Sequence, residues 1–281
     1  MNTLFRCIAY VVLIVACSAI ALSQNQKRTI EKNYSVPSGP GNTLTIFGAP
    51  KGSMTITGSA ANEIEIAAKI TLEGPAQTVI DQLAAVTGFI TEESTGMLIV
   101  KTAGTHNRLG DKKLWKKVPK NVLTLPFRVD YVLKVPRYLD LNVNGGDGSL
   151  NISGIEGAIR VSYGQTQASV TLVGGTFTAQ LGEGELDLRF PERSWRSGMV
   201  DIQLGTGNMN LWLPTTLSAD IDATALNGGS VVVKTDQLKP RDKRVPFTET
   251  AIKARSGTGG VPFKLTVGTG TLSLLSTTRP Q

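Results

Sequence analysis

The sequence predicts an all-β protein of short, glycine-punctuated strands arranged as a solenoid. The observations behind this are 30 glycines in 281 residues, a charged fraction of only 18%, and a nine-residue repeat. Gly148, Gly157, Thr166, Gly175 and Gly184 are spaced by nine, and apolar residues follow each of them at alternate positions. Such alternation is typical of a strand with one buried and one solvated face. Strands at a fixed spacing favour a solenoid, because each unit buries its apolar face by stacking on its neighbours.

Each nine-residue unit is predicted to hold one strand and one turn. Two units per coil place residues 18 apart on top of one another at about 4.8 Å, and three units per coil is the alternative. With two units, Leu150, Ala168 and Leu186 stack on one wall. Ile159 and Phe177 then stack on the opposite wall. The predicted inner face includes Ile152, Ile159, Val170, Phe177 and Leu188.

Residues 1–23 are typical of an export signal, with a basic start, an uncharged run and a small-residue exit. The sequence Ala-Leu-Ser at 21–23 fits a signal-peptidase site. Two alternatives stay open: an uncleaved membrane anchor, and a lipoprotein that begins at Cys17. Cleavage after Ser23 also removes Cys7, and it leaves a cysteine-free chain in the periplasm or at the cell surface.

The rest of the chain is predicted to form two parts. An N-terminal β-rich part covers 24–136, and the β-helix repeats cover 137–281 with a polar insertion at about 234–260. A proline followed by apolar residues on one face predicts a short covering helix at about 75–87. A basic loop follows at about 103–121.

Several segments carry a resemblance to a known family. They are Tyr131-Val-Leu-Lys-Val-Pro with Leu139-Asp-Leu-Asn-Val-Asn-Gly-Gly-Asp-Gly-Ser-Leu-Asn-Ile, then Gly207-Asn-Met-Asn-Leu-Trp-Leu-Pro, and finally Gly259-Gly-Val-Pro-Phe-Lys-Leu through Gly270-Thr-Leu-Ser-Leu. In this order, over roughly residues 29–276, the chain resembles the bacterial putative-adhesin family of unknown function. The resemblance implies a right-handed parallel β-helix on an exported or membrane-anchored chain. It implies no ligand and no functional residue.

The composition excludes several kinds of enzyme site. The chain has one histidine, His106, and both cysteines lie in the predicted export signal. Sites that need several His or Cys ligands, or a Cys/His pair in the mature chain, are therefore excluded. The sequence contains no nucleophile elbow and no phosphate-binding Gly-Lys-Ser/Thr loop. No catalytic, cofactor-binding or metal-binding residue is predicted.

Carboxylates that alternate on predicted strands are the one feature that favours an enzyme. Glu183, Glu185 and Asp187 share an outward face, as do Asp220 and Asp222. Such a cluster suits a cation, or an acid and base in polysaccharide cleavage. We prefer a solvated face, because nothing in the sequence buries one carboxyl group to shift its pKa from that of another.

Positive charge is concentrated in two segments. Residues 101–120 hold seven basic side chains and one acidic one, and residues 234–255 hold seven and three. A tryptophan among the lysines of the first segment gives a mixture that suits anionic lipid, acidic glycan or nucleic acid. Nucleic acid is the weakest of these, because the chain is predicted to be exported and carries no nucleic-acid-binding motif. The predicted anionic-surface site is Arg108, Lys112, Lys113, Trp115, Lys116, Lys117 and Lys120.

The sequence thus predicts a non-enzymatic, exported structural or adhesive module of the cell envelope, built on a β-helix. A β-helix polysaccharide lyase or hydrolase is the alternative, and it requires two carboxylates, or a carboxylate and a basic residue, to converge in a groove. A tether to anionic polymer or lipid is the second alternative. It requires both basic segments to face one side of the solenoid.

Overall fold

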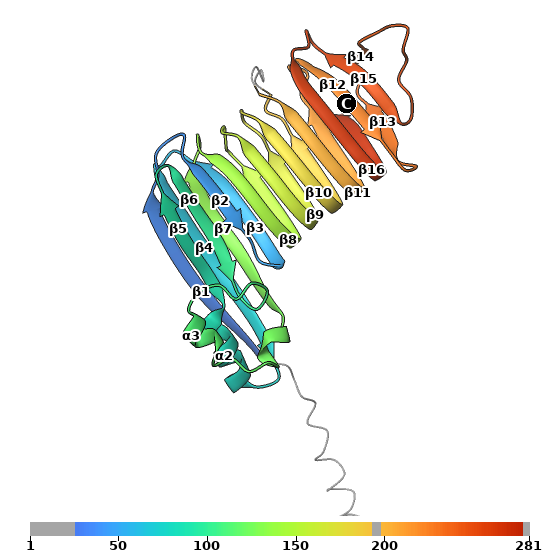
Figure 1. Cartoon of the computed structure of the whole chain (residues 1–281). Coiled ribbons are helices and arrows are strands. Elements are labelled where there is room, and N and C mark those ends of the chain that lie inside the picture. The colour runs from blue at the N-terminus through green and yellow to red at the C-terminus, as the bar shows by residue number, and fades with distance from the viewer. Residues whose placement is uncertain (1–25, 193–197, 278–281) are drawn as a thin grey trace, which may run out of the picture.

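The computed structural model describes residues 26–192 and 198–277, so the predicted export signal lies outside the described residues. The protein is mostly β, as predicted. Among the described residues, 16 strands join in one large sheet that does not close on itself. The path of this sheet begins at β1 and ends at β14. Figure 1 shows an elongated stack of strands with the helices at its N-terminal end.

Five long strands form the parallel centre of the sheet (Figure 1). Phe177 pairs with Ile159, which pairs with Leu141, so successive partners are 18 residues apart. This confirms the predicted 18-residue register, and Ala168 accordingly pairs with both Leu150 and Leu186. The strands are β8 (Asp140–Ser153), β9 (Ile159–Thr171), β10 (Phe177–Arg189), β11 (Val200–Leu213) and β16 (Val261–Ser276).

The prediction of one strand per nine-residue unit is wrong. Strands β8, β10 and β11 run through Gly148, Gly184 and Gly207, whereas Gly157 and Gly175 lie in the connections between strands. Gly207 has φ +132°, and a Cβ on it would lie 1.8 Å from the carbonyl oxygen of the stacked Gly184. Backbone pairing therefore continues through these glycines, because no side chain separates the stacked chains. One strand holds two of the predicted units.

The predicted inner face forms the core of the central strands. Its five members, from Ile152 to Leu188, are each at most 2% exposed. The buried residues on both sides of each strand's glycine belong to one continuous hydrophobic cluster. Burial of each large apolar side chain contributes roughly 1.5 to 3 kcal/mol, so this stacked core stabilises a chain without cysteine pairs in its described residues.

The two halves of the long strands have different partners at the N-terminal end of the stack. The first half of β8 pairs with β2, which also pairs with β6, and the second half pairs with β3, which also pairs with β7. Strand β4 pairs antiparallel with both β1 and β7, and β5 pairs antiparallel with β6. The bounds are β1 (Gln26–Pro37), β2 (Thr43–Phe47), β3 (Lys51–Ser59), β4 (Glu63–Gly74), β5 (Gly88–Ser94), β6 (Met97–Ala103) and β7 (Phe127–Pro136).

The C-terminal end of the stack divides in the same way. The first half of β16 pairs with β12 and its second half with β13, both parallel. Strand β15 pairs antiparallel with β12 and β14, so the polar stretch at 234–260 contains two strands. The bounds are β12 (Ala219–Ala225), β13 (Ser230–Lys234), β14 (Leu238–Pro240) and β15 (Ala251–Ser256).

The predicted covering helix is present as α2 (Gln77–Val86), whose Ile80, Leu83 and Val86 are buried. The basic loop contains a short helix that was not predicted, α3 (Lys112–Trp115), and a second short helical turn, η1 (Val122–Thr124), follows the loop. The Asp111 carboxylate accepts a hydrogen bond from the backbone N–H of Lys113 at 2.7 Å and caps α3. A helix cap needs only one suitable residue. The aspartate before the lysines was therefore the only sequence signal for α3.

Candidate functional site

The predicted anionic-surface site lies on the segment 108–120, which we call the basic segment. It connects β6 to β7 and lies beside α2 at the N-terminal end of the stack (Figure 1). Its Arg108 and five lysines are all exposed. None of the five lysines forms an ion pair with a carboxylate of the described residues. The segment therefore presents unneutralised positive charge to solvent.

Trp115 has a different setting from its lysine neighbours. Its side chain is half-buried, and the indole N–H donates a hydrogen bond to the carbonyl oxygen of Leu109 at 2.8 Å. This hydrogen bond joins α3 to the residues of the loop that precede it. The apolar side chain exposed among the lysines is Leu114, which is 40% exposed and was not predicted as a site residue. Trp115 was the only uncharged residue of this run that the sequence predicted as part of the site.

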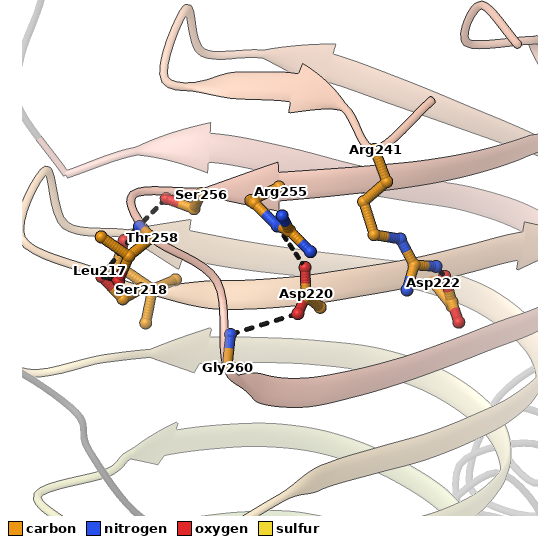
Figure 2. A network of polar contacts seen from close by, with 9 residues as sticks. All are labelled: Leu217, Ser218, Asp220, Asp222, Arg241, Arg255, Ser256, Thr258 and Gly260. Carbon is orange, nitrogen blue, oxygen red and sulfur yellow. Dashed lines mark hydrogen bonds and ion pairs between the residues drawn. The ribbon is translucent and has the colours of Figure 1, made fainter. Parts of the chain in front are cut away.

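The second basic segment, 234–255, is partly neutralised by carboxylates outside it (Figure 2). Arg255 Nε donates to Asp220 Oδ1 at 2.8 Å, and the backbone N–H of Gly260 donates to Asp220 Oδ2 at 3.1 Å. Arg241 forms an ion pair with Asp222. The two aspartates of β12 therefore pair with Arg255 of β15 and with Arg241, the residue after β14.

The two basic segments lie at opposite ends of the stack (Figure 1). Six strand spacings separate β3 from β12, which at about 4.8 Å each is about 30 Å. Screening acts over about 8 Å at physiological ionic strength, so the two segments act independently. Along the stack they are too far apart to form one continuous positive patch.

The carboxylates on β10 contact polar side chains of the next strand. The Glu185 carboxylate accepts a hydrogen bond from Asn210 Nδ2 at 3.3 Å, and Asp187 accepts one from Trp212 Nε1 at 3.4 Å. The Arg189 guanidinium lies 4.8 Å from the centre of the Trp212 ring. These contacts give the row a structural role on the outer face. Within the described residues, no group of three His, Cys, Asp or Glu side chains is placed to hold a metal ion.

The Asp220 network makes a pH-dependent contribution to stability. The hydrogen bond from Arg255 is the main cause that holds the pKa of Asp220 below its ordinary value, and the Gly260 N–H adds to it. A carboxyl group with a lowered folded pKa stabilises the fold above its unfolded pKa, and this contribution is lost as pH falls through the folded value. We expect Asp220→Asn to reduce the fall in melting temperature between about pH 5 and pH 3. Asp236→Asn, at an exposed position, is the control and should leave that fall unchanged.

A further cationic cluster, outside both basic segments, was not predicted from the sequence. Lys27, Lys51, Lys69 and Arg128 come from four strands and line one cavity. Strand alternation predicts that each side chain points outward. Their convergence depends on the pairing of β1, β3, β4 and β7, which no local pattern reveals.

No helix within the described ranges is long and apolar enough to cross a membrane. No protein-family model matches the chain, and no curated protein is similar to it in sequence. The solved structures that it resembles include a putative cell adhesion protein from Clostridium sporogenes, with 12% identity, a TM-score of 0.47, and coverage of 89% of this chain and 100% of that one. A putative adhesin from Bacteroides fragilis has 14% identity, a TM-score of 0.28, and coverage of 89% and 98%.

A putative lipid binding protein from Parabacteroides distasonis has 11% identity, a TM-score of 0.22, and coverage of 89% of this chain and 95% of that one. A putative adhesin from the same organism has 9% identity and a TM-score of 0.27, with coverage of 88% and 97%. The names of the neighbours from C. sporogenes and B. fragilis and of this second P. distasonis protein agree with the family that the sequence resembles. The chain is thus similar to bacterial proteins named as adhesins or cell adhesion proteins.

Proposed function

We propose that this chain is a non-enzymatic, exported interaction module of the cell envelope, built on a parallel β-helix, that attaches to an anionic surface through its basic segment. The division into an N-terminal part over 24–136 and repeats over 137–281 belongs to the same proposal. So does the β-helix, which the length of the strands supports.

A strand as long as β8 has to fold back on itself. Its 14 residues would extend about 46 Å if straight, at about 3.3 Å each. The five residues 154–158 reach at most about 21 Å. Yet Ile159 at the start of β9 pairs with Leu141 at the start of β8. A bend near Gly148 satisfies both requirements and gives a flattened coil with two walls. Such parallel crossovers are right-handed in nearly all proteins.

The single observation that supports the attachment is the exposure of Leu114 among unpaired lysines. On α3 and its flank, Lys112, Lys113, Lys116 and Lys117 surround an apolar side chain that is 40% exposed. Each lysine near an anionic lipid surface contributes about 1 kcal/mol. The exposed leucine strengthens binding only if binding removes it from water. A lipid headgroup layer can bury the leucine in this way, and a solvated acidic glycan cannot. The combination favours an anionic lipid surface.

Attachment is tested with a variant in which Lys112, Lys113, Lys116 and Lys117 are all replaced by Gln, which we call the loop variant. We expect the parent to sediment with vesicles of phosphatidylglycerol and phosphatidylcholine, and the loop variant to bind at least about tenfold more weakly at low salt. Raising salt from about 0.05 M to about 0.5 M should weaken the parent in the same way.

Leu114→Gln separates lipid from glycan. It should weaken binding to the vesicles and leave any binding to a soluble acidic polysaccharide unchanged, because only the lipid removes the leucine from water. Vesicle binding that is absent in the parent, or equal in parent and loop variant, contradicts the proposal. Capture by the polysaccharide alone would assign the site to a glycan.

A further inference from the structure

The cavity on the outer face of β1, β3, β4 and β7 has a volume of about 610 Å³, and none of the basic segment's lysines lines it. Four cationic side chains and two threonine hydroxyl groups line it, together with two carboxylates. The cationic members are Lys27, Lys51, Lys69 and Arg128, the threonines are Thr29 and Thr71, and the carboxylates are Glu73 and Asp130.

Strand pairing brings these groups together from distant parts of the sequence. Thr71 on β4 pairs with Thr29 on β1 and with Arg128 on β7, so these side chains form one row across the sheet. Lys51 is the first residue of β3, and Gly52 follows it. A Cβ on Gly52 would lie 1.8 Å from the carbonyl oxygen of Val129, so β3 approaches β7 more closely there than any other residue allows.

Both carboxylates of the cavity are already engaged. Glu73 lies 3.5 Å from Lys27 Nζ, and Asp130 Oδ1 lies 2.8 Å from a terminal nitrogen of Arg128. Lys51 and Lys69 form no ion pair with any carboxylate of the described chain. After the two ion pairs, two positive charges therefore face the cavity.

Arg128 is held in place by a chain of hydrogen bonds. Its Nε donates to both oxygens of Asp130, at 2.9 and 3.0 Å. Asp130 Oδ1 in turn accepts hydrogen bonds from the backbone N–H of Ser53 at 2.9 Å and from its hydroxyl at 2.6 Å. A guanidinium that is fixed from behind binds an oxyanion with less loss of side-chain entropy.

We propose that this cavity binds a phosphate group, as the free dianion or as a phosphomonoester. Two unpaired ammonium groups match its two negative charges, the guanidinium offers planar N–H donors, and the threonine hydroxyls are placed to bond the remaining oxygens. The site is separate from the attachment through the basic segment and does not depend on it.

The first test is calorimetric titration of the full mature chain with inorganic phosphate. We expect binding in the parent, and a dissociation constant at least about tenfold higher in Lys51→Gln/Lys69→Gln, because each lost lysine removes a charge-assisted hydrogen bond. The control is Lys239→Gln/Lys253→Gln, which removes the same charge at exposed positions of β14 and β15 and should bind as the parent does. The loop variant should also bind as the parent does, which separates this site from the proposed function.

A second arm distinguishes the source of the phosphate. The loop variant is first tested for capture by phosphatidic acid vesicles, and Lys51→Gln/Lys69→Gln is then added to it. If the added substitutions abolish the capture, the site binds a lipid headgroup. Loss of inorganic phosphate binding alone assigns it to the free ion. Either result supports the proposal. Absence of binding to both probes, or equal loss in the cavity variant and its charge-matched control, overturns it.

Asp130→Asn tests whether Arg128 is positioned. The substitution removes a negative charge beside the cavity, so a simple electrostatic patch would bind phosphate more tightly. If the guanidinium depends on Asp130 for its orientation, the variant should bind phosphate more weakly. Its melting temperature checks that the variant is folded. Tighter binding would overturn the positioned site.

Discussion

Replacing Phe177 by aspartate is expected to unfold the protein. The side chain is 0% exposed and lies in register between Ile159 and Val200 in the stacked core. Loss of a buried phenylalanine costs roughly 3 to 5 kcal/mol, and an unpaired buried carboxylate adds to this. The sum approaches the whole stability of a typical domain, about 5 to 15 kcal/mol. Circular dichroism and denaturant unfolding of the purified variant measure the effect.

Gln180→Asp is the matched control on the same strand. It introduces the same carboxylate three residues further along β10, at an exposed position on the outer face. We expect it to cost about 1 kcal/mol or less, from the lower strand propensity of aspartate. Similar losses of stability in the two variants would show that the assignment of inner and outer faces is wrong.

Gly207→Ala is expected to destabilise the protein by about 3 kcal/mol or more, although it adds only one methyl group. Gly207 adopts φ +132°, and the new Cβ would lie 1.8 Å from the carbonyl oxygen of Gly184 on the neighbouring strand. Neither contact partner has a side chain that moves aside, so β10 and β11 have to separate. The midpoint of urea unfolding, compared at constant slope, reports the change.

The same substitution at Gly39 is the control. A Cβ at Gly39 meets nothing within 4 Å. Gly39→Ala should therefore alter the free energy of unfolding by about 1 kcal/mol or less. Any stabilisation would come from the lower conformational entropy of the unfolded chain. If Gly207→Ala were as mild as Gly39→Ala, the close stacking of strands at the central glycines would be contradicted.

The sequence alone predicted the strand register well and the strand ends poorly. Alternation identifies Ile159 and Phe177 as inward residues, and the repeat spacing makes them partners, because both follow from the two-residue period of a strand. The same pattern does not show whether a glycine ends a strand or bends it. Gly175 lies in a connection and Gly184 within β10, although both occupy the same position in the repeat.

The sites depended on contacts that sequence does not encode locally. Asp220 pairs with Arg255, 35 residues away, so a count of charges in one segment overestimated its free positive charge. The side chains that line the proposed phosphate cavity come together only through the pairing of four strands. By contrast, the exposure of the lysines in the basic segment followed directly from composition, because burying a run of unpaired lysines costs too much free energy.

The most direct test of attachment through the N-terminal end compares two variants of equal charge. The loop variant removes four lysines at 112–117, and a second variant replaces Lys234, Lys239, Lys243 and Lys253 by Gln at the opposite end of the stack. Sedimentation with phosphatidylglycerol vesicles at low salt measures both. We expect the loop variant to lose at least about tenfold in affinity and the second variant to bind within about twofold of the parent. Equal losses would mean that net charge alone attracts the protein to the membrane, and they would contradict a site on the basic segment.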